Sequence, residues 1–446
     1  MIDRLTKAGE KALAWAGQAG LEAEAFLLHT RELSIEIVNQ QVDSLKQAEE
    51  IGLGLRVINQ HRLGFAYSTE LSDQAIKKVV EDAIGISNYT TLDEFHAFPK
   101  GAFTLPQLHI YDDAIPQTSL DHKISLARKL EQIAKKKDQR VTVVEKAGYE
   151  DTEFTCLVMN SSGVKCAAIG NFCGIFLFLV AEERGDAQNG FGMMLKRRIK
   201  EMDPGLVGQE TVENAVRMLN AKTISSTKTC CLLEPYVASK FLALISQMVN
   251  ADAVLKGKSL LAQRQGDRIA GSSVNLVDNG LYEEGAGCFP FDDEGYPAQN
   301  KTIIENGILM GFLHDTYTAK RCGVESTGNS QRASFRSMPS IGTTNFYLQP
   351  GKRTQAEMIA EIDRGLLVTE VLGMHTANPI SGDFSLGAAG IMIEKGRLSY
   401  PVRGLTIAGN LITLLKDIEE VGSDLRFFGS RGSPTILIKN VSIGGD

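Results

Sequence analysis

The hydrophobic positions of the first 90 residues change period along the chain. Apolar residues at 5–16 recur at helical spacing, whereas those at 33–37 alternate with polar neighbours as in a half-buried strand. Residues 52–57 and 64–67 predict two further strands joined by a polar turn. An amphipathic helix is expected at 76–84. This pattern predicts an N-terminal α+β domain over residues 1–90.

Residues 91–116 lose this periodicity and contain three prolines, which indicates a linker. A second α+β domain is expected at 117–222, where a helix at 124–133 ends in three lysines. Strands are predicted between residues 155 and 194, and a helix at 213–219 is expected to close the domain.

The two predicted domains share an order of strand, turn and glycine-led strand. Each ends its strands with a Gly-Phe pair, Gly64-Phe65 in the first and Gly190-Phe191 in the second. This similarity indicates a degenerate internal duplication.

The remaining residues, 223–446, contain strong local signals. Pro235 occupies the expected first position of an apolar helix. Asn306-Gly307 lies between two apolar segments and predicts a hairpin, because both residues tolerate the positive φ of a type I′ turn. Another helix is expected at 411–421.

The long strands have few helices between them. Successive parallel strands need crossover helices, so this order favours antiparallel pairing. We therefore predict an α+β fold with mostly antiparallel sheets and flanking helices, in which N-terminal α/β units precede a larger strand-rich C-terminal domain.

Composition and charge narrow the function. The 446 residues carry a net charge of -7, which argues against direct nucleic-acid binding because phosphates require an excess of Lys and Arg. No apolar run reaches the roughly 18 residues of a membrane span, and residues 1–4 begin an amphipathic pattern and not a signal peptide. A cytoplasmic protein without membrane contact is expected.

The cysteines agree with that location. There are seven, an odd number, and most stand in apolar surroundings. This predicts buried thiols in a reducing compartment. None forms a Cys-x-x-Cys pair, so a cysteine-based zinc site is not predicted.

Candidate chemistry is concentrated between Gly365 and Asn410, where a glycine-punctuated loop separates apolar runs. The candidate residues are His375, Asn378, Ser381, Gly382, Asp383 and Ser385. One interpretation is nucleophilic catalysis, in which His375 and Asp383 activate a serine, although no Gly-x-Ser-x-Gly elbow is present. The other is structural, since Asn, Ser and Asp side chains commonly hydrogen-bond their own loop backbone.

Other motifs are weaker. No two histidines are spaced to share a helix face, which disfavours a metallohydrolase site in this chain alone. The acidic run Asp292-Asp293-Glu294 is interpreted as a solvated turn. Gly52 and Gly54 begin a partial nucleotide fingerprint, but no third glycine or helix follows at the required spacing.

Several ordered blocks resemble one known family. They read Asp292-Asp293-Glu294-Gly295, Ile304-Glu305-Asn306-Gly307, Ser326-Thr327-Gly328-Asn329-Ser330, Pro350-Gly351-Lys352-Arg353-Thr354, Ser381-Gly382-Asp383-Phe384-Ser385, Gly404-Leu405-Thr406-Ile407-Ala408-Gly409-Asn410 and Val421-Gly422-Ser423-Asp424. With these blocks the chain resembles the TldD/PmbA family over nearly its whole length, and its PmbA (TldE) branch more closely. The family is linked to processing or degrading small unfolded peptides, and older names call its members modulators of DNA gyrase.

The resemblance also has implications for a metal. In the TldD branch, a His-Glu-x-x-x-His helix and a later cysteine hold the metal. The matching helix here, Phe241 to Asn250, has no histidine or carboxylate, and no cysteine follows Cys322. The resemblance therefore implies no metal, no other cofactor and no catalytic residue in this chain.

The implied function is that of a non-metal subunit in a peptide-processing protease. Its partner would be a TldD-like metal-bearing subunit or a second copy of the chain, and its substrate an unfolded peptide. The loop residues from His375 to Ser385 are then expected to contact the peptide. Two alternatives stay open: an autonomous hydrolase using His375 and Asp383, and a protein-contact regulator of a DNA-associated enzyme.

Overall fold

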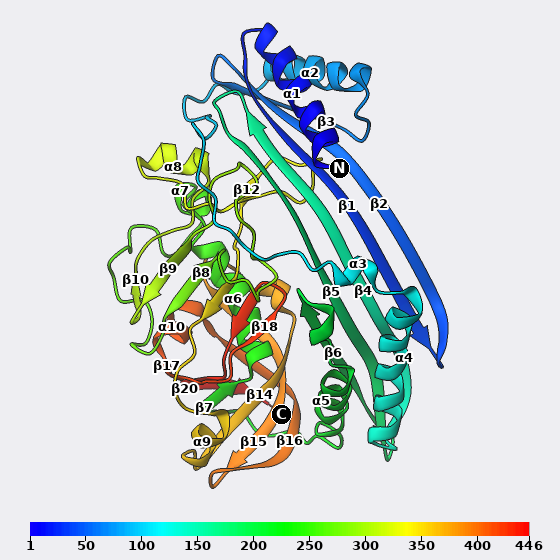
Figure 1. The fold of residues 1–446 in the computed structure, drawn as a ribbon. Coiled ribbons are helices and arrows are strands. Elements are labelled where there is room, and N and C mark those ends of the chain that lie inside the picture. The colour runs from blue at the N-terminus through cyan, green and yellow to red at the C-terminus, as the bar shows by residue number, and fades with distance from the viewer. Residues whose placement is uncertain (446) are drawn as a thin grey trace.

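The computed structural model describes residues 1–445 and shows an α+β fold, as predicted. Two N-terminal units share one long twisted sheet, and the strand-rich C-terminal part packs beside it (Figure 1). Within residues 1–445, no helix combines the length and apolar character needed to cross a membrane.

The first sheet has six strands in the order β3-β2-β1-β4-β5-β6, all paired antiparallel. Its strands are β1 (Glu22–Val38), β2 (Gln41–Asn59), β3 (Arg62–Ser68), β4 (Val141–Asn160), β5 (Lys165–Glu183) and β6 (Asp186–Lys196). The two units meet where β1 pairs with β4. The first two predicted domains therefore share one continuous sheet.

Helices cover one face of this sheet (Figure 1). The helices of the two units are α1 (Ile2–Gln18), α2 (Asp73–Ser87), α3 (Ala114–Gln117), α4 (Leu120–Lys137) and α5 (Pro204–Val216), with a 3-10 turn, η1 (Ile199–Glu201). Side chains at positions 23–27 of β1 pack with α1 and α2, and those at 33–37 pack with α4. Because side chains alternate along a strand, the even-numbered positions of β1 face the other way, toward the C-terminal part.

The order helix, three strands, helix occurs twice, in α1-β1-β2-β3-α2 and α4-β4-β5-β6-α5. The repeated Gly-Phe pairs have a packing reason. A Cβ at Gly64 would lie 1.9 Å from the Ala83 carbonyl oxygen of α2, and one at Gly190 would lie 3.0 Å from the Thr211 carbonyl oxygen of α5. In each unit, glycine lets the closing helix approach the last strand.

The segment between the two units runs along the sheet with little regular structure (Figure 1). Asn160 donates from Nδ2 to the Pro99 carbonyl oxygen at 2.9 Å. Asn171 likewise donates to the Asp112 carbonyl oxygen at 2.9 Å. Side-chain amides of β4 and β5 thus hold the backbone of this segment in place.

The C-terminal part contains two six-stranded sheets and a two-stranded ribbon. One sheet has the order β10-β9-β8-β13-β19-β18, with β8 (Leu276–Asn279), β9 (Asn300–Glu305), β10 (Ile308–Leu309), β13 (Phe346–Leu348), β18 (Arg426–Phe428) and β19 (Arg431–Ser433). The other has the order β16-β15-β14-β7-β20-β17, with β7 (Thr227–Leu233), β14 (Arg364–Leu372), β15 (Asp383–Glu394), β16 (Arg397–Asn410), β17 (Ile418–Val421) and β20 (Ile436–Gly444). The ribbon pairs β11 (Ser330–Gln331) with β12 (Ser340–Ile341).

An additional pairing between β16 and β20 closes the second sheet into a barrel. Each larger sheet of this part contains one parallel pair, and the remaining pairs are antiparallel. Its helices are α6 (Pro235–Met248), α7 (Ala251–Leu255), α8 (Thr316–Cys322), α9 (Gln355–Ala360) and α10 (Leu411–Lys416), with a 3-10 turn, η2 (Met374–Thr376). The expected hairpin at Asn306-Gly307 joins β9 to β10, with both residues at positive φ.

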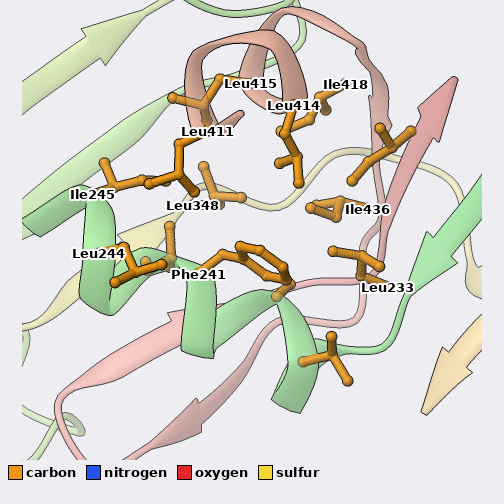
Figure 2. Packing of buried hydrophobic residues seen from close by; sticks show 14 of the residues in the cluster. Leu233, Phe241, Leu244, Ile245, Leu348, Leu411, Leu414, Leu415, Ile418 and Ile436 are labelled. Carbon is orange, nitrogen blue, oxygen red and sulfur yellow. The ribbon is translucent and has the colours of Figure 1, made fainter. Parts of the chain in front are cut away.

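Helix α6 begins at Pro235, as predicted, and forms the centre of the C-terminal core. Figure 2 shows Phe241, Leu244 and Ile245 of α6 packed among leucines and isoleucines from β13, β20 and α10. Its inward face is therefore apolar.

Two helix boundaries differ from the prediction. The helix expected at 411–421 ends at Lys416, because Ile418 pairs with Ile438 in a neighbouring strand and does not continue the helix. The helix expected at 213–219 begins earlier, at Pro204. Gly208 weakens the helical signal there, but a Cβ at this position would lie 2.9 Å from Ile133 of α4.

The C-terminal part packs against the first sheet through Phe335, whose side chain is completely buried. A Cβ at Gly52 would lie 2.2 Å from this ring, and one at Gly54 would lie 2.3 Å from the Phe335 carbonyl oxygen. These glycines, which resemble a nucleotide fingerprint in the sequence, therefore serve close packing between the two parts.

We predict that Gly52→Ala destabilises the protein by about 1–3 kcal/mol, because the added methyl group overpacks a closed contact. Urea unfolding would measure the change. Gly17→Ala is the control, since nothing lies within 4 Å of a Cβ there and the helix gains a better helix former. Adding Phe335→Leu to Gly52→Ala should recover part of the loss. Equal stability of Gly52→Ala and wild type would contradict this packing role.

Candidate functional site

The predicted loop, Met374 to Ser385, covers most of the connection from β14 to β15 and the first residues of β15, and it hydrogen-bonds mainly to itself. Asn378 Oδ1 accepts from the N–H groups of Ile380 at 2.8 Å and Ser381 at 3.2 Å. The Asn378 N–H donates to the Asp383 carbonyl oxygen at 2.9 Å. Asn378 therefore holds the turn together.

The end of this loop is fixed to β16 by Asn410. Its Nδ2 donates to the Ser381 carbonyl oxygen at 2.8 Å and to Asp383 Oδ1 at 2.9 Å. Gly382 lies between them at φ 76°, in the left-handed region that favours glycine. The hydrogen bond from Asn410 holds the pKa of the exposed Asp383 carboxyl below its usual value. A carboxylate in that state is a weak general base.

The remaining two predicted residues are not brought into this network. His375 and Ser385 are exposed, and within residues 1–445 neither side chain makes a hydrogen bond. A serine nucleophile needs a base within hydrogen-bond reach. The structure thus brings Asn378, Ser381, Gly382 and Asp383 together and leaves the histidine apart from both serines.

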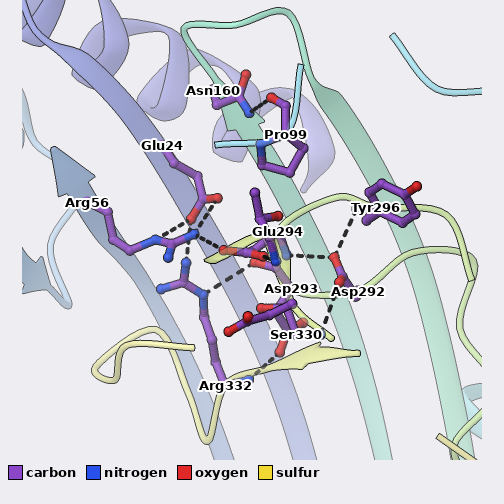
Figure 3. Close-up of polar contacts among 12 residues, drawn as sticks. Glu24, Arg56, Pro99, Asn160, Asp292, Asp293, Glu294, Tyr296, Ser330 and Arg332 are labelled. Atoms are coloured by element: carbon purple, nitrogen blue, oxygen red, sulfur yellow. Dashed lines mark hydrogen bonds and ion pairs between the residues drawn. The ribbon is translucent and has the colours of Figure 1, made fainter. Parts of the chain in front are cut away.

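A different polar cluster lies where the C-terminal part meets the first sheet (Figure 3). Glu24 lies on β1 and Arg56 on β2, whereas Glu294 lies between β8 and β9 and Arg332 follows β11. All four side chains are buried.

Arg56 joins the two glutamates. Its Nε and Nη2 donate to Glu24 at 2.9 Å and 2.8 Å, and Nη2 also donates to Glu294 Oε1 at 2.7 Å. Arg332 pairs with Glu24 from the opposite side. Burial works against the charge of Arg56, but the two carboxylates raise its pKa above the usual value. Two buried cations therefore balance two buried carboxylates.

The acidic run Asp292-Asp293-Glu294 belongs to this cluster, so its interpretation as a solvated turn is wrong. Asp292 accepts from the N–H groups of Glu294 and Tyr296, both at 2.9 Å, and from that of Ser330 at 3.0 Å. Backbone donors and arginines replace the water that these carboxylates lose on burial. The acidic run is therefore held by hydrogen bonds and ion pairs in the interior of the fold.

Asp293 has an unusual ionisation. The N–H of Arg332 donates to its Oδ2 at 2.5 Å. Burial nevertheless raises the pKa of Asp293 to about 6, and the charges of Glu24 and Glu294 act in the same direction.

A cavity of about 410 Å³ lies beside the cluster, between the first sheet and loops of the C-terminal part. This volume falls in the range of small-ligand pockets. Aromatic side chains from both parts line it: Phe26, Phe154, Phe172, Phe289 and Phe291. None of the six predicted loop residues is part of its lining.

A small groove with a volume of about 40 Å³ adjoins the cavity and shares Phe172, Arg197 and Ala286 with it. The groove is also lined by Met193 of β6 and Phe427 of β18. Both strands are the last in their sheets. Within residues 1–445, no strand pairs with the outer edge of either one.

One feature of the sequence indicates the buried charged cluster. Glu24 and Arg56 each interrupt an apolar strand, and a buried charge requires a partner. The identity of that partner was not local, because Arg56 and Glu294 are 238 residues apart in the chain.

Comparison with known proteins gives a consistent result. Three family profiles match the chain: PmbA/TldA metallopeptidase domain 1 at residues 23–87, the central domain at 113–219 and the C-terminal domain at 226–445. Metalloprotease PmbA of Escherichia coli O157:H7 is 27% identical, over 99% of this chain and 96% of that protein.

Solved structures are also similar. A Thermotoga maritima protein described as a candidate modulator of a DNA gyrase superposes with a TM-score of 0.91 at 28% identity, covering 98% of this chain and all of the other. TldE from Thermococcus kodakarensis shares the fold with a TM-score of 0.90 at 24% identity, over 98% of this chain and 100% of its own.

A metallopeptidase description implies a metal, but the side chains of residues 1–445 do not fit one. Within residues 1–445, no three His, Cys, Asp or Glu side chains gather as a donor set. Helix α6 directs Phe241, Ile245 and Met248 into the apolar core, and Phe241 packs edge-to-face on Phe384 with ring centroids 5.4 Å apart. Such side chains do not coordinate zinc.

The ionisation of Asp293 gives a testable pH dependence. Its pKa is near 4 in an unfolded chain and about 6 in the folded protein, so the folded state binds more protons between these values. The contribution of the Asp293 carboxyl to the free energy of unfolding is therefore fully present below about pH 4 and is lost as the pH rises to about 6.

We predict that the free energy of unfolding of Asp293→Asn, relative to that of wild type, increases by on the order of 2–3 kcal/mol as the pH rises from about 4 to about 6. Denaturant unfolding at several pH values would measure the difference. The exposed Asp43→Asn is the control for a charge change on the surface. A difference between Asp293→Asn and wild type that does not vary with pH would contradict the assignment.

Proposed function

The chain belongs to the PmbA/TldD family of metallopeptidases, and from this membership we propose that it acts as a PmbA/TldE-like subunit without its own catalytic metal. In this proposal it pairs with a TldD-like metal-bearing subunit, or with a second copy of itself, and helps to bind unfolded peptides for proteolysis.

The observation that carries the proposal is the composition of α6. In the TldD branch, the corresponding helix is the one that bears the His-Glu-x-x-x-His motif. Here the helix fills the C-terminal core with Phe241, Leu244, Ile245 and Met248. Introducing metal ligands at these positions would bury polar groups in an apolar core, which is unfavourable. The metal chemistry is therefore assigned to another subunit.

Peptide binding is supported by the free edges of β6 and β18 beside the groove. An extended peptide can add to such an edge through backbone hydrogen bonds. Since backbone groups are common to all residues, this mode tolerates many sequences and suits an unfolded substrate. The adjoining cavity offers room for a side chain.

The loop Met374 to Ser385 is a second proposed peptide contact. Asn378 and Asp383 fix its shape, while His375 and Ser385 remain exposed. A rigid loop that presents unpaired polar side chains is suited to binding.

We place this function in the cytoplasm. Within residues 1–445, all seven cysteines are free thiols, and five of them are buried. Free thiols are typical of a reducing compartment.

The first test compares the purified chain with and without a TldD-type partner. We expect that the chain alone carries no stoichiometric zinc and does not cleave an unstructured peptide, whereas the mixture does. Metal analysis and a peptide-cleavage assay provide the measurements, with the partner alone as control. Cleavage by the lone chain together with stoichiometric zinc would overturn the proposal.

The second test distinguishes a residue that maintains the loop conformation, Asn378, from one proposed to contact the peptide, His375. Asn378→Ala should lower stability by about 0.5–1.5 kcal/mol because the N–H groups of Ile380 and Ser381 lose their acceptor, and His375→Ala should leave the melting temperature unchanged. Both should reduce peptide cleavage by the complex. Tyr89→Ala, a highly exposed position elsewhere, is the matched surface control. Full activity of His375→Ala would remove this residue from the peptide-binding surface.

A further inference from the structure

Arg197 is a buried arginine that has only carbonyl partners. Its residue is 5% exposed. Its two terminal nitrogens donate to the carbonyl oxygens of Asn171 at 3.3 Å, Ala286 at 3.1 Å and Cys288 at 2.7 Å. Its Nε has no hydrogen-bond partner. Within residues 1–445, no carboxylate pairs with this guanidinium.

A buried cation without a counter-charge is energetically unfavourable. Burial lowers the pKa of Arg197, but an arginine remains charged at neutral pH. The buried Arg56 and Arg332 both have carboxylate partners. An external anion would give Arg197 the same compensation.

Arg197 lies where the cavity and the groove meet, because it lines both. Ser330 and Thr344 line the same cavity, and their buried hydroxyl oxygens also have no partner. The nearby carboxylates are already engaged, Asp292 by three backbone N–H groups and Asp293 by the N–H of Arg332. The unsatisfied groups of the cavity therefore favour a ligand that accepts hydrogen bonds.

The rest of the lining is largely apolar and aromatic, apart from Asp292, Asp293, Gln331 and Arg332, so a ligand that combines a hydrophobic group with an anionic group matches it. The last residue of a peptide has both features, a side chain and an α-carboxylate. The groove beside β6 shares Arg197 with the cavity, so the residues that precede the last one would extend from that side along the free edge of β6.

We propose that the cavity binds the C-terminal residue of an unfolded peptide, with an aromatic or large aliphatic side chain between the phenylalanines and its α-carboxylate at Arg197. This inference rests on the proposed peptide-binding function and adds which end of the peptide is recognised.

The test measures binding of N-acetyl-phenylalanine and of its amide to the full-length chain by calorimetry. The two probes differ only at the terminal group, which is a charged carboxylate in one and a neutral amide in the other. We expect the acid to bind at least about tenfold more tightly, the range of a hydrogen bond to a charged group. Equal binding of the two probes, or binding of neither, would overturn the proposal.

Variants test whether Arg197 is the residue that contacts the carboxylate of the probe. Arg197→Gln should bring the acid-to-amide ratio close to one, and Arg197→Lys, which keeps the charge, should retain part of the preference. Leu28→Trp places a larger side chain in the cavity lining. It should weaken the binding of both probes while leaving Arg197 intact. Circular dichroism and thermal unfolding identify any variant that fails to fold. A preference for the acid that survives in folded Arg197→Gln would contradict the assignment.

Peptide cleavage with a TldD-type partner is measured separately on peptides with a free or an amidated C-terminus. Cleavage of both at equal rates would overturn the terminal-carboxylate inference and leave the proposed subunit role standing. Loss of all cleavage in the complex would instead contradict the proposed function, whatever the binding ratio of the lone chain.

Discussion

Arg56 makes the contact on which the arrangement of the two parts depends. It binds Glu24 on the neighbouring strand and Glu294 in a loop 238 residues later in the chain. Removing one partner from a buried ion pair typically costs about 3–5 kcal/mol, whereas replacing the whole set by apolar groups can be neutral or stabilising. The network therefore specifies how the C-terminal part docks on the sheet more than it adds net stability.

That docking also creates the cavity. Glu24, Phe26 and Leu28 alternate on the same face of β1, so one stretch of strand supplies first a charge for the network and then part of an apolar wall. Arg332 lies over the Phe26 ring, 4.9 Å from its centroid. Phe335 closes the contact where Gly52 leaves space. Neither part alone would enclose this volume, because its walls come from both.

The sequence predicted those features that depend on neighbouring residues. The α+β class, the Asn306-Gly307 hairpin and the start of α6 follow from periodicity and turn chemistry. The helix expected to reach Val421 was wrong, because Ile418 pairs with Ile438 of β20, a partner that helical periodicity does not reveal. The acidic run was misjudged for the same reason, since its arginine partners are distant. The cavity has no sequence signature, because its walls come from segments that only folding brings together.

The lining of the cavity is suited to recognition of a ligand. A nucleophile there would have to be a thiolate, a deprotonated hydroxyl or a free carboxylate. Burial raises the pKa of Cys288 to about 11 and also raises that of Cys156 well above its usual value, so both thiols are protonated and weakly nucleophilic. Asp292 is held by three N–H donors. An uncompensated guanidinium and unpaired hydroxyls can bind an anion, but within residues 1–445 no base contacts them. These groups therefore fit the proposed role in peptide binding.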